Sequence, residues 1–153
     1  MKKIISVLLL LSLLFLSGCG AKETKSALSC EEIAKKVQES AAFQELTPMT
    51  DKYIAKHLFI DGEMLSDQCM LRDATAATPE FILVVEVKEE KNVKEIRQAV
   101  QEYLDEMLPQ YRDYQPAEMP KLESAQVTVK GKKIALIVSP DAKKTSSALE
   151  SAW

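Results

Sequence analysis

The side chains best suited to nucleophilic or metal chemistry are three cysteines and a single histidine, His57. Zinc sites gather several such ligands at short spacing, as in the CxxC and HExxH motifs, and His57 has none nearby. We therefore predict no metal site and interpret His57 as a half-exposed residue near the end of a short helix. A nucleophilic pair of His57 with Cys30 or Cys69 is an alternative that rests on composition alone.

The acidic side chains offer a second kind of chemistry. Glu102 and Glu106 are spaced i,i+4 with Asp105 beside them, which places them in one region of a helix. Acid–base pairs of the glycosidase type come from different elements and face each other across a substrate, so these carboxylates are interpreted as a solvated face. Phosphate-binding loops need clustered glycines, whereas Gly62 and Gly131 stand alone. We predict no catalytic residue and no cofactor.

The first residues have the layout of a secretory signal peptide. Residues 1–3 (MKK) are basic, and residues 4–16 (IISVLLLLSLLFL) are apolar apart from two serines. As a helix this apolar run would reach about 20 Å, short of the roughly 30 Å of hydrocarbon that a spanning helix must cross. The segment is therefore interpreted as a cleaved signal over residues 1–18.

The sequence Leu16-Ser17-Gly18-Cys19 resembles the lipobox of bacterial lipoproteins, in which small residues precede the cysteine that becomes the mature N-terminus. The resemblance implies cleavage between Gly18 and Cys19 and acylation of the Cys19 thiol. Two acyl chains on one residue are enough for stable anchoring. The protein is therefore expected at the outer face of the cell membrane. An ordinary signal peptide with an incidental Cys19 is the alternative.

Residues 19–29 are small and polar and have no apolar periodicity, which is typical of a flexible tether. Two thiols, Cys30 and Cys69, then remain outside the cell, where oxidising conditions permit a disulfide. We slightly favour that disulfide over two buried free thiols.

The length of the rest, residues 30–153, fits a single domain. Hydrophobic residues make up 46% of the chain and charged residues 28%, close to globular averages. Removal of residues 1–18 changes the formal net charge from −3 to −5. Nucleic acid is therefore not expected as a partner.

The apolar periodicity predicts four helices and four strands. Ser29 with Glu32 forms a capping-box pattern, and Asn92 with Glu95 marks the start of the longest amphipathic helix. Helices are expected over residues 30–42, 51–58, 92–108 and 141–149, and strands over residues 67–73, 80–88, 126–130 and 134–138. After Pro109 the pattern becomes irregular, so the long helix is expected to end there.

The resulting order, ααββαββα, favours an α+β fold. Its sheet would be antiparallel and built of two β-hairpins joined by the long amphipathic helix, with the helices mainly on one face. The run at residues 80–88 (EFILVVEVK) is expected to lie centrally in that sheet because it is dense in β-branched and aromatic residues.

An aromatic and basic cluster follows the long helix. Tyr111, Arg112 and Tyr114 could form a contact surface for a partner, because aromatic and arginine side chains provide large contact area. The alternative is that the two tyrosines cover the core.

The whole pattern resembles the bacterial lipoproteins that carry domain of unknown function 4358. The likeness rests on the lipobox, the turn at residues 61–63 (DGE) before a strand, and the hairpin turn at residues 129–131 (VKG) before the strand at 134–138. It implies a small extracytoplasmic lipoprotein and no catalytic residues.

We therefore expect a non-catalytic binding or structural module, anchored in the membrane by lipid, whose partner is an envelope protein or ligand. A small hydrolase acting on envelope material is the alternative hypothesis.

Overall fold

The computed structural model describes residues 27–153. The predicted signal peptide, the predicted acylation site Cys19 and most of the predicted tether lie outside the described residues.

The centre of the molecule is a five-stranded antiparallel sheet, so the predicted α+β class is confirmed. Its spatial order is β1-β2-β3-β5-β4, and β3 lies in the middle, as its dense apolar run predicts. The strands are β1 (Leu46–Pro48), β2 (Leu65–Asp73), β3 (Phe81–Val87), β4 (Val127–Lys130) and β5 (Lys133–Val138).

In the described part of the chain, five α-helices surround the sheet: α2 (Cys30–Glu39), α3 (Asp51–His57), α4 (Val93–Tyr114), α5 (Met119–Glu123) and α6 (Ala142–Ala152). Short 3₁₀ turns occupy Gly62–Met64, Glu90–Asn92 and Pro116–Glu118. The observed order differs from the predicted ααββαββα by the short strand β1 and the short helix α5. Both are too short to produce a periodic apolar signal.

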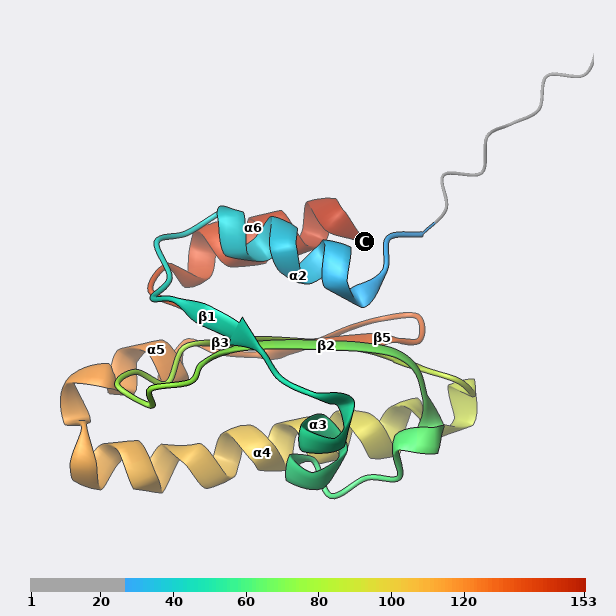
Figure 1. Ribbon diagram of the computed structural model, residues 1–153, viewed down its shortest axis with the longest axis horizontal. Coiled ribbons are helices and arrows are strands. Elements are labelled where there is room, and N and C mark those ends of the chain that lie inside the picture. The colour runs from blue at the N-terminus through green and yellow to red at the C-terminus, as the bar shows by residue number, and fades with distance from the viewer. Residues whose placement is uncertain (1–26) are drawn as a thin grey trace, which may run out of the picture.

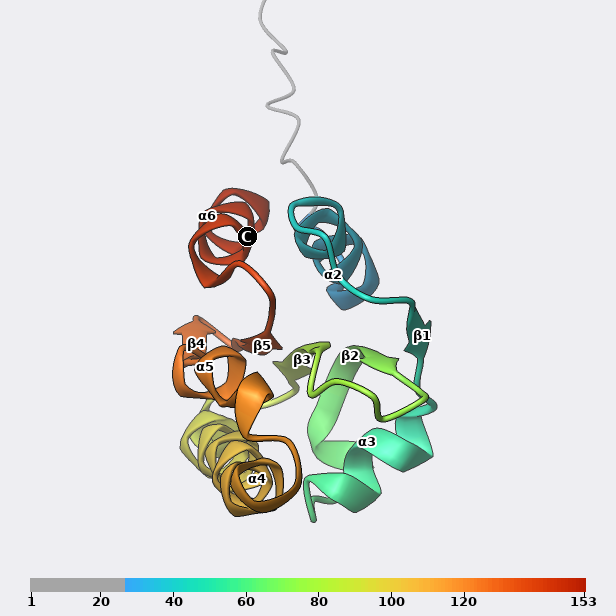
Figure 2. The same cartoon turned by 90° about the vertical axis from the view of Figure 1, so that its left-hand side faces the viewer.

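The helices cover both faces of the sheet, so the expectation that they gather mainly on one face is wrong. Figures 1 and 2 show α2 and α6 on one side and α3, α4 and α5 on the other. The reason is the alternation in β3. Phe81, Leu83 and Val85 pack in the cluster beneath α4, whereas Ile82 and Val84 pack in the cluster beneath α2 and α6. A strand that is apolar on both faces needs a cover on each.

The helix starts follow the expected chemistry with one exception. Ser29 and Glu32 form the predicted capping box of α2, and Thr50 caps α3 by accepting a hydrogen bond from the Tyr53 amide. Asn92 makes no side-chain cap, because the 3₁₀ turn before α4 already holds it in a helical conformation.

Helix α4 continues through Pro109 to Tyr114, so the irregular stretch expected after Pro109 is wrong. The Pro109 side chain is exposed. Beyond it, Tyr111 packs against the core beneath α4. This tertiary contact favours the helical course despite the hydrogen bond that proline cannot donate.

Cys30 and Cys69 are both buried as free thiols, so the favoured disulfide is absent from this structure. Both lie in the apolar cluster beneath α2 and α6. Burial raises the pKa of the Cys69 thiol to about 11 and also raises that of Cys30. A buried thiol with a raised pKa forms little of the thiolate that attacks disulfides.

Candidate functional site

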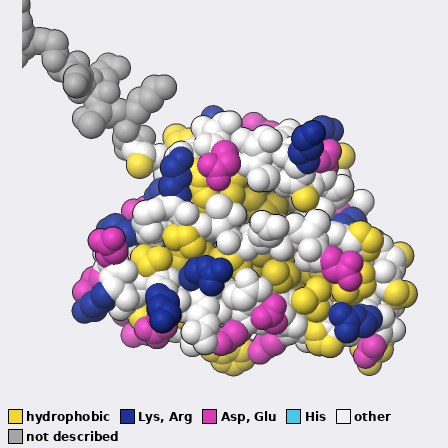
Figure 3. Space-filling model, turned by 180° about the vertical axis from the view of Figure 1, so that it is seen from behind, with side chains coloured by type: hydrophobic (Ala, Val, Ile, Leu, Met, Phe, Trp, Pro, Cys, Tyr) yellow, Lys and Arg dark blue, Asp and Glu magenta, His cyan; other side chains and the backbone are white. Residues whose placement is uncertain are grey.

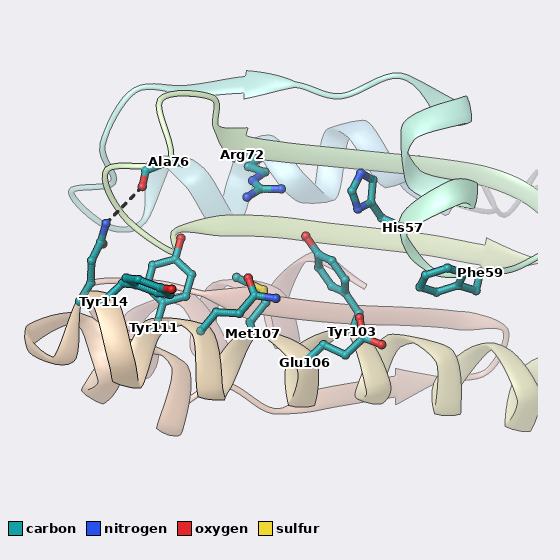
Figure 4. A pocket seen from close by; sticks show the side chains of 11 residues that line it. His57, Phe59, Arg72, Ala76, Tyr103, Glu106, Met107, Tyr111 and Tyr114 are labelled. Carbon is teal, nitrogen blue, oxygen red and sulfur yellow. Dashed lines mark hydrogen bonds between the residues drawn. The ribbon is translucent and has the colours of Figure 1, made fainter.

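A pocket of about 400 Å³ opens between α4 on one side and β2 with the end of α3 on the other. Figure 4 shows how its side chains converge from these elements. Four aromatic side chains line it: Phe59, Tyr103, Tyr111 and Tyr114. Three further lining side chains can carry a charge: His57, Arg72 and Glu106. Its size is within the range of small-molecule sites.

One stripe of α4 forms the longer wall. Tyr103, Met107, Tyr111 and Tyr114 recur at three- and four-residue intervals, so they share one side of the helix. Burial decreases along this stripe. Tyr103 and Met107 are each 7% exposed, whereas Tyr114 is 86% exposed. The wall therefore has an anchored part next to the core and a free aromatic side chain at its end.

Arg72 reaches the pocket from the opposite wall (Figure 4). Arg72 lies two residues after Met70 in β2, and side chains two residues apart in a strand point to the same face of the sheet. Because Met70 packs in the cluster beneath α4, Arg72 also points to the α4 side. The guanidinium donates a hydrogen bond to the Tyr53 hydroxyl and lies 6.0 Å from the centre of the Tyr53 ring. Among the described residues, no carboxylate forms an ion pair with Arg72.

His57 lies at the end of α3, between two tyrosines. Its ring centre is 4.0 Å from that of Tyr53 and 6.5 Å from that of Tyr103. Burial lowers the pKa of His57, and the positive charges of Arg72 and Lys56 lower it further. His57 is therefore neutral at pH 7, and Arg72 provides the positive charge of the pocket wall.

The turn between β2 and β3 closes one end of the pocket. Asp73 is buried there, and accepts hydrogen bonds from the backbone amides of Thr75 at 2.8 Å and Thr78 at 2.9 Å, and from both hydroxyls. Two side chains at the end of α4 form hydrogen bonds with the same turn. Tyr111 Oη donates to the Thr78 carbonyl at 3.1 Å, and Gln115 Nε2 lies 3.5 Å from the Ala76 carbonyl oxygen.

Two lining residues have an unusual backbone. Phe59 (φ 52°) and Ala76 (φ 55°) are the non-glycine residues with positive φ in the part of the chain that the structure describes. A positive φ angle costs energy for residues that have a Cβ atom, and residues in this conformation are concentrated at functional sites. Phe59 is also 83% exposed, so it projects from a strained turn at the edge of the pocket.

Some of the candidate residues that the sequence analysis named line the pocket, and others do not. Tyr111 and Tyr114 meet in the pocket, whereas Arg112 is exposed and does not line it. Glu106 lines the pocket, but Glu102 is exposed and bonded to Gln98.

The alternative Cys–His nucleophilic pair is wrong. His57 lies beside Tyr103 on the α4 side of the sheet, and the two cysteines belong to the cluster on the other face.

Sequence reasoning missed Arg72 and the role of Tyr103. The signal for Tyr103 was the helical spacing of Tyr103, Met107 and Tyr111, which becomes visible only if the helix is continued past Pro109. The signal for Arg72 was weaker, because a lone basic residue in a strand is most often solvated.

Within residues 27–153, no three His, Cys, Asp or Glu side chains come together in a way that could hold a metal ion. None of the helices in the same range combines the length and apolarity needed to cross a bilayer.

Comparison with protein families matches residues 39–139 to the family described as Domain of unknown function (DUF4358). The chain belongs to this family. The matched segment includes β1 to β5 and the whole candidate pocket, and leaves out all of α6 and all of α2 except Glu39. Searches of curated proteins and of solved structures found no match.

Proposed function

We propose that this protein is a non-catalytic binding module, held at the outer face of the cell membrane by lipid on Cys19, whose ligand occupies the pocket beside α4. The observation that carries the proposal is the position of the exposed aromatic side chains. Phe59 and Tyr114 are the two most exposed large hydrophobic residues in residues 27–153, and both line this pocket. Exposed apolar groups gathered around a concavity are typical of binding sites.

The charge near the start of the domain supports the proposed location. A second hollow beside Leu28 is lined by four lysines, Lys36, Lys130, Lys132 and Lys133, and one acidic residue, Glu86. Figure 3 shows basic side chains close to the point where the chain enters the domain. Lipid anchoring through Cys19 would bring this end next to the membrane, where anionic headgroups attract lysines.

A site-specific crosslinking experiment in cells tests the proposal. A photoreactive phenylalanine analogue replaces Tyr114 in the full chain, and the matched control places it at Arg112, which is also exposed but does not line the pocket. We expect an adduct of defined mass at position 114 and none at position 112. The absence of an adduct at 114, or the same adducts at both positions, would contradict a ligand in this pocket.

The alternative hydrolase is favoured by one observation, the presence of neutral His57 and Glu106 in the same pocket. A neutral imidazole can act as a general base. The lining includes no serine, threonine, cysteine or lysine, so such a hydrolase would use water activated by His57 or Glu106 as its nucleophile. Turnover of peptidoglycan or peptide by the purified protein, abolished in His57→Ala, would replace the binding proposal with the hydrolase.

A further inference from the structure

Building on the proposed function, we propose that the pocket beside α4 takes a small ligand with a carboxylate on a flat apolar body, and that Arg72 recognises the carboxylate. Within residues 27–153, Arg72 beside Tyr53 is the guanidinium found close to an aromatic ring, and it lines a pocket with further aromatic walls.

The first argument is the unused donor capacity of Arg72. A guanidinium carries five N–H donors in a planar fork, and the described residues provide one acceptor for it, the Tyr53 hydroxyl. The side chain is half-buried, and burying a charge without a partner is costly. Its remaining donors can pair with both oxygens of a carboxylate, which is the geometry that arginine fits best.

The second argument is that Tyr53 holds Arg72 in place. The guanidinium is bonded to the Tyr53 hydroxyl and lies 6.0 Å from the centre of its ring, and that ring is stacked on His57. A side chain fixed before binding loses less conformational entropy when the ligand arrives. The site is therefore preorganised for an anion.

The charge of the pocket favours a single negative charge on the ligand. Arg72 is positive, His57 is neutral at pH 7, and Glu106 on α4 adds one negative charge to the lining. A doubly charged phosphate would be poorly compensated by one guanidinium in a pocket that also contains a carboxylate. A monoanionic carboxylate matches the arrangement better.

The remaining lining fits a flat apolar body. The rings of Tyr103, Tyr111 and Tyr114 and the flexible Met107 form a continuous wall along α4. Aromatic faces and thioethers favour planar apolar groups. In addition, Gln115 Oε1 is buried and accepts no hydrogen bond from the described residues, so it is available to a donor on the ligand.

A matched pair of probes tests this inference on residues 20–153 with the tether included. The probes are 2-naphthoate and 2-naphthamide, which share shape and differ in charge, and binding is followed through the backbone amide signals of Arg72, Met107 and Gln115. We expect the naphthoate to bind about tenfold more tightly. The phosphate monoester 2-naphthyl phosphate should bind more weakly than the naphthoate.

Variants assign the preference to Arg72. Arg72→Gln should remove the difference between the two probes, while the exposed Arg112→Gln, the matched control, should retain it. Arg72→Lys keeps the charge without the fork and should retain part of the difference. Because Arg72→Gln also loses the bond to Tyr53, Glu106→Gln provides a test that leaves this contact untouched. It should raise naphthoate affinity about two- to threefold and leave naphthamide binding unchanged.

The outcomes separate the two proposals. Equal affinity for both probes, an unchanged preference in Arg72→Gln, or tighter binding of the phosphate would overturn the carboxylate inference while leaving a ligand-binding pocket in place. If neither probe shifts an amide signal at millimolar concentration, the pocket itself fails and the proposed function fails with it.

Discussion

The tyrosines that end α4 combine two different roles at a spacing of three residues. Tyr111 is half-buried, packs against the core and donates a hydrogen bond to the Thr78 carbonyl. Tyr114 is 86% exposed. At the residue scale, the interpretation as a core cover therefore applies to Tyr111, whereas Tyr114 is free for the proposed contact surface, which stays a prediction.

This division predicts different effects of the two alanine variants. Tyr111→Ala should lower the free energy of unfolding by about 2 kcal/mol, because it removes buried ring surface and a hydrogen bond. Tyr114→Ala should change it by less than about 0.5 kcal/mol and weaken ligand binding instead. Chemical denaturation measures both values. Equal destabilisation would show that Tyr114 is also structural.

Asp73 gives the turn at the end of the pocket a dependence on pH. Hydrogen bonds from Thr75, the largest effect, and from Thr78 lower the pKa of Asp73. A carboxyl whose pKa is lower in the folded state contributes stability above its unfolded pKa and loses that contribution as the pH falls through the folded value. The contribution should therefore be complete at pH 7 and decline below about pH 4.

Asp73→Asn should thus be less stable than the wild type by about 2 kcal/mol at pH 7, and the difference should shrink as the pH falls below about 4. Denaturant unfolding at a series of pH values measures this difference. The exposed Asp113→Asn is the control and should follow the wild type throughout. A constant gap between wild type and Asp73→Asn would refute the electrostatic explanation.

At the scale of the element, the course of α4 through Pro109 determines whether the pocket exists. The residues beyond it, Gln110 to Tyr114, bring Tyr111 and Tyr114 into line with Tyr103. Proline inside a helix cannot donate to the carbonyl four residues earlier, here that of Asp105. The last turn and a half of α4 is consequently held by its tertiary contacts.

Replacing this proline should therefore stabilise the protein. Pro109→Ala restores the missing donor and removes the ring, and we expect a gain of about 1 kcal/mol in the free energy of unfolding. Pro140→Ala, in the exposed connection after β5, should instead lower stability slightly because the unfolded chain gains freedom. Thermal unfolding compares them. A loss of stability in Pro109→Ala would mean that the proline fits the native helix better than alanine does.

Some helices and strands were predictable from their local sequence pattern, whereas the positions of others in the fold were not. The apolar stripe of α4 from Ile96 to Met107 and the hairpin around Gly131 were predictable, because their periodicity is local. The placement of α2 and α6 on the second face was not, since it depends on contacts between the two ends of the domain. The run at residues 81–85 carried the relevant signal, an apolar strand on both faces.

The candidate site was only partly predictable for the same reason. Tyr111 and Tyr114 were singled out by residue type, but Arg72 became part of the site only when the fold brought β2 opposite α4. Its neighbours in space, Tyr53 and Tyr103, lie 19 residues before it and 31 residues after it in the chain. No local sequence pattern predicts that these three side chains lie close together.

At the scale of the whole molecule, the sheet separates the start of the described domain from the pocket. The chain enters the domain at α2 on one face, and the pocket lies on the α4 side (Figure 1). An anchor attached to the α2 side would therefore leave the pocket open to the medium. Such an arrangement would suit the proposed tethered binding module.

The anchor itself provides the final prediction. Two acyl chains bury many methylene groups, each contributing about 0.8 kcal/mol to membrane binding. The full chain, produced in a bacterial host fed a fatty-acid analogue, should carry the label and sediment with membranes. Cys19→Ser should lose both properties, because the thiol is the proposed acylation site. The control is Cys30→Ser, which removes a buried thiol of the folded domain and should keep the label. If Cys19→Ser protein is still labelled and membrane-bound, or if Cys30→Ser loses the label, the anchor is not on Cys19.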